Sequence, residues 1–115
     1  MLQIKERALK AIEYAQEKKA NRPVLMDLRK LTAMTDYFVI LSATNTKQVE
    51  AIAEHISKSF KDNDELLATT IERDKECNWI LLDYADFIVH VFNDKARDYY
   101  DLERLWSDAE ITEVL

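Results

Sequence analysis

The stretch WILLDYADFIVHVF, residues 79–92, decides the fold of this chain. Two apolar runs rich in β-forming residues flank residues 83–86, a polar break short enough to be a turn, so the pattern predicts a β-hairpin inside a sheet. Side-chain alternation divides the first strand into two faces, with Trp79, Leu81 and Asp83 on one and Ile80 and Leu82 on the other. One face must pack against helices, which leaves the face that begins with Trp79 as a candidate contact surface.

The sequence on both sides of the hairpin predicts alternating helices and strands. Apolar residues at helical spacing predict one helix from Ile4 to about Asn21, a second that Asn45 or Thr46 caps, and a third from Asp94. The second helix carries one apolar stripe, Val49, Ile52, Ala53, Ile56 and Phe60. The third is expected to gather four large side chains on one side, Tyr99, Leu102, Leu105 and Trp106. Strands are expected at 24–28, 36–43 and, more exposed, 65–72, besides the two of the hairpin.

This order predicts an α/β or α+β fold, a mixed five-stranded sheet flanked by helices. A single domain is expected over residues 1–108, followed by an acidic C-terminal tail, 109–115, that frays. No apolar run approaches the ~20 residues that span a bilayer. The charged N-terminal stretch is unlike a signal peptide, and the lone cysteine, Cys77, fits a reducing compartment, so we expect a cytoplasmic protein.

The composition excludes several classes of function. The chain of 115 residues contains no glycine, and the common phosphate-binding loops need glycine for close backbone approach to the anion. The 22 acidic residues exceed the 16 basic ones, which gives a net charge of −6. Direct nucleic-acid binding normally needs a basic face. An acidic surface instead favours a basic protein partner, and ribosomal proteins are the commonest of these.

The residues that could carry chemistry are few and scattered. His55 is expected on the polar side of the second helix, and His90 in the core or an interface, in phase with Ile88 and Phe92. Two separated histidines give no metal-ligand pattern, and Cys77 has no histidine near it in sequence. The pair Asp83 and Asp86 has the spacing of a turn rather than of a two-metal site, and Arg97, Glu103 and Arg104 are expected on a solvated helix face.

Three blocks of the sequence resemble the ribosomal silencing factor family, also called the Iojap family. They are LMDLRKLTAMTDYFVILSATNTKQVEAIAEHI (25–56), WILLDYADFIVHVF (79–92) and RDYYDLERLW (97–106), in the family's order and spacing. The resemblance runs from about residue 4 to Asp108. The sequence lacks glycines that many members carry, with Ala43, Arg73 and Ala85 in their places, which affects the turns.

The resemblance implies a nucleotidyltransferase-like fold without the active site, and no enzyme activity or cofactor. It further implies binding to the large ribosomal subunit through its ribosomal protein number fourteen. The resemblance implies that joining of the small subunit is thereby blocked and that translation is lowered when nutrients are scarce. Fold alone would not establish this function.

The candidate partner-binding residues come from the hairpin and from the family's last block. They are Trp79, Leu81, Asp83, Tyr84, Asp86, Tyr99, Tyr100, Glu103 and Trp106. Trp79 fits an interface anchor and a core residue equally well, whereas Trp106 fits the core better. Two other functions remain open: a homodimeric interaction module that uses the same apolar face, and a relic nucleotidyltransferase with magnesium on Asp36, Asp83 or Asp86.

Overall fold

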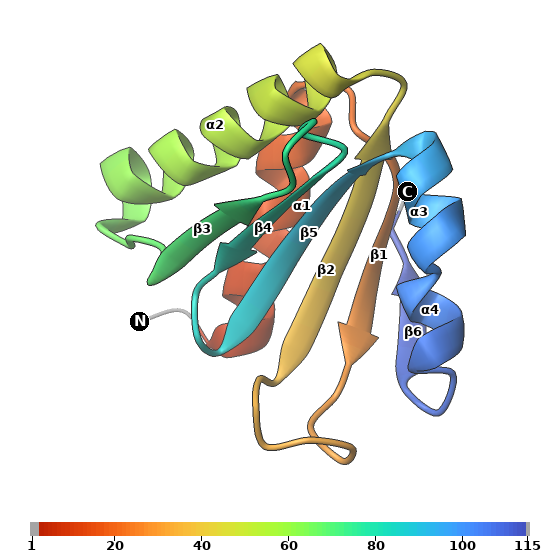
Figure 1. Cartoon of the computed structure of the whole chain (residues 1–115). Coiled ribbons are helices and arrows are strands. Elements are labelled where there is room, and N and C mark those ends of the chain that lie inside the picture. Colours follow the sequence, from red (N-terminus) through yellow and green to blue (C-terminus); the bar gives the residue numbers. More distant parts are fainter. Residues whose placement is uncertain (1–2, 115) are drawn as a thin grey trace.

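The computed structural model describes residues 3–114 and alternates helices with strands (Figure 1). The helices are α1 (Ile4–Glu17), α2 (Thr46–Asp64), α3 (Asp94–Tyr100) and α4 (Leu102–Leu105). The strands are β1 (Asn21–Asp27), β2 (Tyr37–Ala43), β3 (Thr70–Arg73), β4 (Trp79–Asp83), β5 (Phe87–Asn93) and β6 (Glu110–Glu113). The predicted mixed sheet flanked by helices is confirmed, with one strand more than expected.

The six strands lie in the order β3-β4-β5-β2-β1-β6. β2 and β5 run parallel at the centre of the sheet, and every other neighbouring pair is antiparallel. Helices lie on both faces, so the central strands are enclosed on both sides (Figure 1). All seven residues of β2 are therefore buried, as is usual for a parallel strand inside a sheet.

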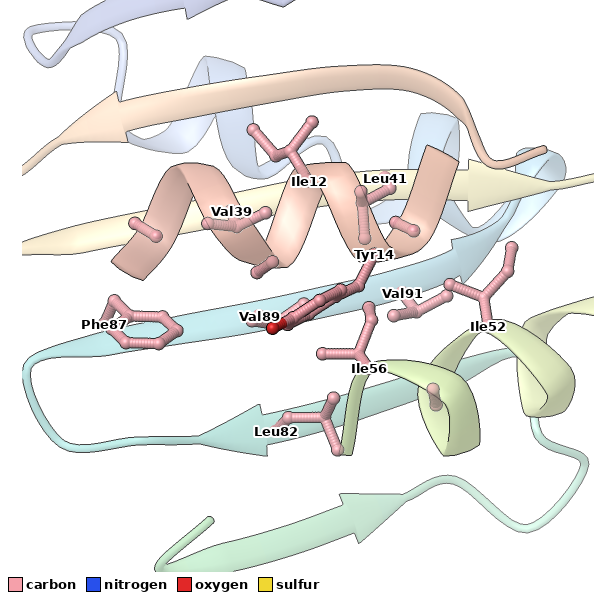
Figure 2. Packing of buried hydrophobic residues seen from close by; sticks show 14 of the residues in the cluster. Ile12, Tyr14, Val39, Leu41, Ile52, Ile56, Leu82, Phe87, Val89 and Val91 are labelled. Carbon is pink, nitrogen blue, oxygen red and sulfur yellow. The ribbon is translucent and has the colours of Figure 1, made fainter. Parts of the chain in front are cut away.

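α1 and α2 cover one face of the sheet and enclose the larger of two apolar clusters (Figure 2). The predicted stripe of α2 is confirmed, because its five apolar members are all buried against the strands. The predicted start of this helix is also confirmed. Asn45 precedes α2, and its side-chain oxygen accepts a hydrogen bond from the Gln48 amide over 2.9 Å, which satisfies a backbone donor of the first turn.

The predicted hairpin is formed by β4 and β5, with Trp79 opposite Phe92. Ile80 and Leu82 are buried under the helices, whereas Trp79 and Leu81 lie on the other face and are half-buried. The division of β4 into two faces follows the sequence pattern.

The hairpin turn shows what the missing glycines mean. Ala85 has φ 69°, a left-handed value that glycine adopts without steric cost, and the Asp83 carboxylate accepts its amide over 2.8 Å. Ala43 and Arg73 lie in strands and do not have positive φ. Of these three positions, only Ala85 has a conformation that favours glycine.

Several expected boundaries were wrong. α1 ends at Glu17 and Asn21 already opens β1, three residues before the expected start of that strand. The expected strand 65–72 is reduced to β3, because Leu66 and Ala68 leave the sheet and pack against the core cluster. The part of the tail over Glu110–Glu113, expected to fray, forms β6 and pairs antiparallel with β1.

The expected third helix is divided into α3 and α4. Asp101 between them has φ 46°, so the second helix starts in a new direction. The prediction that four large side chains share one side of this helix was wrong. Leu102 and Trp106 pack on the sheet, whereas Tyr99 and Leu105 point to solvent.

Candidate docking surface

Trp79 lies at the start of β4, on the sheet face opposite α1 and α2. Its indole ring stacks on Phe92, with the two ring centroids 5.0 Å apart, and the ring centroid of Tyr100 in α3 lies 4.8 Å from that of the indole. The indole Nε1–H donates to Nδ1 of His90 over 3.1 Å. One side of the ring is thus fixed by the core while the residue stays half-buried.

His90 is the buried partner that orients Trp79. Because Nδ1 accepts the indole proton, the ring hydrogen of the neutral imidazole is on Nε2, which has no partner among residues 3–114. Burial lowers the pKa of His90 to about 3, so the ring is neutral near pH 7. Its expected place in the core is confirmed, and its role here is to position the indole.

The backbone entering β4 is held by Asp74. One carboxylate oxygen of Asp74 accepts the amides of Asn78 and Trp79 over 2.6 and 3.1 Å. Within that loop Cys77 has φ 58°. The loop closes as a compact turn immediately before Trp79, and the position of the indole is therefore fixed through its backbone as well as its ring.

α3 and α4 add three further apolar side chains, of which Tyr100 contacts Trp79, Tyr99 packs edge-on against Tyr100, and Leu105 lines a hollow with both tyrosines. Tyr99 is 82% exposed and Leu105 73% exposed, and Tyr100 lies with part of its ring on Trp79. The aromatic surface, as we call it, consists of Trp79, Leu81, Tyr99, Tyr100 and Leu105. Apolar side chains this exposed, next to an aromatic ring held in place, are typical of residues that make protein contacts.

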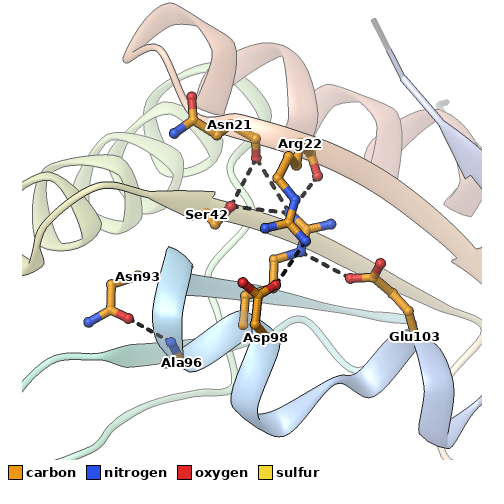
Figure 3. Close-up of polar contacts among 8 residues, drawn as sticks. Asn21, Arg22, Ser42, Asn93, Ala96, Asp98 and Glu103 are labelled. Carbon is orange, nitrogen blue, oxygen red and sulfur yellow. Dashed lines mark hydrogen bonds and ion pairs between the residues drawn. The ribbon is translucent and has the colours of Figure 1, made fainter.

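Arg97 anchors α3, although the sequence pattern placed it on a solvated face, which was wrong. Its guanidinium is 3% exposed, with Nη1 donating to the Arg22 carbonyl over 2.6 Å and to Ser42 Oγ over 3.2 Å (Figure 3). Its Nε donates to Glu103 over 3.0 Å. Burial lowers the pKa of Arg97 and the Glu103 carboxylate opposes that change. This network ties α3, α4, β1 and β2 together.

The aromatic surface has two shallow hollows with charged borders. One of about 480 Å³ lies at the junction of the two short helices, lined by Tyr99, Leu105, Arg104 and the carboxylates Asp98 and Asp101. The other, about 150 Å³, lies beside Trp79 and Leu81 and is bordered by two carboxylates and one guanidinium, those of Glu72, Asp74 and Arg73. Carboxylates border both hollows, and their negative charge suits a basic partner.

The other candidate residues occupy different places. Tyr84 is buried on the opposite face, against Phe60 and Phe87, so its side chain is not exposed in this structure. Asp83 and Asp86 are at the far end of β4 from Trp79, in the hairpin turn. Glu103 is paired with Arg97, and Trp106 packs edge-on against Phe38 at 5.9 Å. The structure thus brings together the hairpin tryptophan and the tyrosines but not the aspartates.

The sites considered for chemistry remain separate. Asp36 lies beside the turn, its amide donating to the Asp86 carbonyl over 2.9 Å, yet residues 3–114 contain no group of three His, Cys, Asp or Glu placed to hold a metal. A hydrogen bond with Glu50 raises the pKa of Cys77, which disfavours the thiolate. His55 pairs with Glu17 of α1 over 2.7 Å.

In the part of the chain described, no helix is long and apolar enough to cross a membrane.

Sequence reasoning missed Asp74 and the true environment of Arg97. A signal for Asp74 was present, since an aspartate ahead of a short polar link before a strand is typical of side-chain-capped turns. No local signal distinguishes Arg97 from an exposed arginine, because all its acceptors are distant in sequence except Glu103.

Comparisons with known proteins agree on one family. A family model described as "Ribosomal silencing factor during starvation" matches residues 2–114. The chain is 33% identical over 104 residues to "Ribosomal silencing factor RsfS" of Halalkalibacterium halodurans, covering 90% of this chain and 88% of that protein. It is 36% identical to the protein of the same name from Bacillus subtilis, over 85% of this chain and 82% of the other. It is also 31% identical to "Protein Iojap, chloroplastic" of Zea mays, over 93% of this chain and 46% of that protein.

Solved structures have the same fold. A crystal structure of a protein from Chromobacterium violaceum superposes with a TM-score of 0.87 at 27% identity, covering 99% of this chain and 94% of the other. A crystal structure of a Bacillus halodurans protein gives 0.80 at 30% identity, over 96% of this chain and 99% of the other. The names of the relatives denote silencing factors and indicate no catalytic activity.

Proposed function

Because the chain belongs to the ribosomal silencing factor family, we propose that it binds the large ribosomal subunit and prevents the small subunit from joining. The contact we propose is with ribosomal protein number fourteen of the large subunit. Translation would then fall when nutrients are limiting, as the family description suggests. We further propose that the protein acts in the cytoplasm, the location that the sequence leads us to expect.

The observation that carries this proposal is the aromatic surface. Trp79 is held by His90, Phe92 and Tyr100, so its indole loses little conformational freedom when a partner covers it. Tyr99 and Leu105 extend the apolar area beside it, both more than 70% exposed. Rigid aromatic side chains at the centre of a contact usually supply most of its binding energy.

Charge supports the same kind of partner. The chain has a net charge of −6, and carboxylates such as Asp98, Asp101 and Asp74 border the hollows of the aromatic surface. A basic ribosomal protein would meet opposite charges at the rim and apolar side chains at the centre. Association should therefore slow as salt rises, with a smaller effect on dissociation.

The mechanism we propose is occupation of space. Inhibition governed by binding equilibrium requires about one protein molecule per large subunit and ends when the protein is diluted. Subunits that have already joined should resist, since their own interface crowds the docking site. No chemical change of the ribosome is needed.

Subunit joining tests this mechanism directly. Purified large subunits are incubated with increasing amounts of the protein, small subunits are added, and joining is followed by light scattering. We expect inhibition to rise in proportion to the protein until about one molecule per large subunit, and joining to return after the protein is washed away. Inhibition at far lower ratios that persists after removal would mean catalysis and would overturn the proposal.

Tyr99→Ala tests the surface itself, with Met34→Ala as the matched control. Both side chains are more than 70% exposed, and Met34 lies in the β1–β2 loop at the other end of the sheet from Trp79. Tyr99→Ala should weaken inhibition of joining while the unfolding midpoint stays the same, whereas Met34→Ala should change neither. Equal inhibition by both variants would place the contact elsewhere.

A homodimer through the aromatic surface is the second candidate. The exposed Tyr99 and Leu105 would be covered in such a dimer as well as by the ribosome. Sedimentation equilibrium of the wild-type protein and of Tyr99→Ala distinguishes the two, since a dimer through this surface should weaken in the variant. Such a dimer would compete with ribosome binding.

A further inference from the structure

A second concave surface lies on the opposite side of the sheet, between α2 and the edge strand β3. It is a groove of about 410 Å³ with an apolar floor made by Ile71, Ile80 and Leu82. In Figure 1, β3 is the outermost strand at one side of the sheet and α2 runs above it. Since Ile80 and Leu82 face away from Trp79, the floor of this edge groove lies on the other face of the sheet from the aromatic surface. Arg73 at the sheet edge lines both the groove and the hollow beside Trp79.

The backbone of β3 is open along one side. All four of its residues are exposed, and β4 is its one partner in the sheet. Asp74 donates its amide to the Trp79 carbonyl over 3.1 Å, which fixes the phase of the antiparallel ladder. Alternation then directs the N–H and C=O of Glu72 and Thr70 toward β4, and those of Ile71 and Arg73 outward.

Ile71 and Arg73, whose backbone groups point away from β4, also have side chains that border the groove. Ile71 and Arg73 pair with Leu82 and Ile80 across the ladder, so all four lie on the α2 side. The Ile71 side chain is 46% exposed. An extended chain added alongside β3 would thus find free backbone partners and, on its α2 side, an apolar floor. Edge strands next to a helix bind peptides in this way in several unrelated domains.

Charge indicates what such a peptide would carry. Lys58 and Lys61 of α2 and Arg73 of β3 line the groove, and within residues 3–114 none of them forms an ion pair. Glu54 and Asp62 also line it, which leaves an excess of one positive charge on a chain of net charge −6. The groove is therefore a local exception to the acidic character of the chain.

We propose that the edge groove binds an extended peptide segment of a partner protein as an added strand on β3. In that segment two groove-facing positions, i and i+2, carry one apolar and one acidic side chain. The apolar side chain covers Ile71, and the carboxylate lies between Arg73 and the two lysines of α2. Because the groove and the aromatic surface lie on opposite faces, the chain can hold this partner and the ribosome together. The proposal does not depend on the proposed ribosomal function.

A defined peptide tests the groove. The probe is a seven-residue peptide with blocked ends. Positions whose side chains face the groove carry valine and glutamate in alternation, and the positions between them, whose side chains face away from the groove, carry threonine. Titrated into ¹⁵N-labelled full chain, it should saturate chemical-shift changes at residues 70–73 and slow hydrogen exchange of the Ile71 and Arg73 amides. The same peptide with lysine in place of glutamate should bind less well.

Two variants identify the forces involved. Lys58→Glu combined with Lys61→Glu should weaken binding by at least ~10-fold because it reverses two charges beside the bound carboxylate. Lys30→Glu combined with Lys95→Glu makes the same change in net charge at exposed positions outside the groove and should have little effect. Ile71→Pro should abolish binding, since it removes an outward N–H that β4 does not use and edge strands tolerate proline.

Three results would overturn the proposal. The first is an affinity that the reversal of Lys58 and Lys61 leaves unchanged. The second is a set of shifts centred on Trp79 rather than on β3. The third is an equal response to disodium succinate, which has carboxylates but no backbone, and which would identify a site for small anions. If Ile71→Pro unfolds the chain, the charge variants still decide the outcome.

Discussion

The face of the sheet under α1 and α2 is filled almost entirely by apolar side chains, whereas the face under α3 and α4 is closed only in part. The first face holds the larger cluster, with side chains such as Phe60, Ile52 and Val89 fully buried. The second leaves Trp79 and Leu81 half-buried and encloses a histidine and an arginine. Long amphipathic helices cover the first face, and two short helices cover the second.

This difference separates stability from recognition within one small domain. Apolar contacts on the first face are numerous and lack directional preference, so they stabilise the fold without fixing any exposed side chain. Hydrogen bonds on the second face hold particular groups in particular directions: His90 fixes the indole of Trp79, and Arg97 fixes α3. Substitutions on the two faces should therefore affect different measurements.

The largest effect on the free energy of unfolding is expected from Phe60→Ala on the first face. Phe60 is fully buried and packs against Tyr14, Tyr84 and Phe87 with ring centroids 5.1, 5.0 and 5.8 Å away. Its truncation should lower the free energy of unfolding by about 4 kcal/mol, measured with urea. The fraction that stays folded should inhibit subunit joining normally. A loss of inhibition larger than the loss of folded protein would contradict the separation of the two faces.

A slightly smaller loss is expected from Arg97→Met on the second face. The substitution keeps much of the volume but leaves Glu103 and the Arg22 carbonyl without their donor, so stability should fall by about 3 kcal/mol. Unlike Phe60→Ala, it should also weaken inhibition of joining, because α3 carries both tyrosines. The matched control is Arg22→Met, whose side chain is half exposed and forms a surface pair with Asp98 at 3.2 Å. That control should cost no more than about 1 kcal/mol.

Trp79→Ala should weaken binding more than it lowers stability, which is the opposite of the result expected for Phe60→Ala. Binding to the large subunit should weaken by about 2 kcal/mol, as for truncation of an aromatic anchor, while the protein stays folded. Isothermal titration calorimetry with the large subunit measures the first effect and urea unfolding the second. A steep fall in stability with normal binding by the folded fraction would show that Trp79 belongs to the core alone.

The effect that is smallest near neutral pH, and that grows only as pH falls, is a pH dependence that the second face adds through His90. Burial lowers the folded pKa of His90 from its ordinary value of 6.5 to about 3, so between these values the unfolded chain binds the extra proton. Stability from this residue is complete above pH 6.5 and falls as pH decreases, by up to about 1.4 kcal/mol per pH unit. His90→Phe should flatten the dependence of unfolding free energy on pH between 6 and 4.

The pH window separates His90 from the carboxylates. A hydrogen bond from Arg29 lowers the pKa of Asp27 below the ordinary value of 3.8 in the folded state. Burial alone would raise the pKa of Asp64, but hydrogen bonds from Lys10 and Tyr14 outweigh it and hold that pKa below 3.8 as well. Their contribution is therefore present above the unfolded pKa and lost only as pH falls through the lower folded one. An unchanged slope between pH 6 and 4 in His90→Phe would show that His90 does not control this part of the curve.

Features with a strict period were predictable from the sequence. Alternation in β4 separated Ile80 from Trp79 and Leu81, and helical spacing gave the stripe of α2 that ends at Phe60. Both features depend on which face of the element is buried, and the spacing of apolar residues along the sequence predicts that face. The cap at Asn45 was predictable because its hydrogen bond reaches only three residues along the chain.

Features that depend on distant partners were not predictable in the same way. β6 has one apolar residue, Ile111, among its four, and it becomes a strand because β1 offers an edge. The break at Asp101 needs a left-handed residue where no glycine marks it. Arg97 is buried because its acceptors come from β1 and β2, which no local pattern reveals. Of the candidate site, the tryptophan and tyrosines could be identified, but the groups that hold them could not.

The pairing of β6 with β1 has a consequence for how the chain is synthesised. β1 is made before β6, the strand that covers its outer edge, so that edge stays unpaired while residues 28–109 are translated. Open edges on a nascent protein attract other strands, and crowded polysomes bring such edges close together. Pro23, which has no amide hydrogen to donate, and the irregular pairing between Asn21 and Val24 make the start of that edge a poor template. The same irregularity that accommodates Arg97 in the finished fold would thus protect the unfinished one from its neighbours.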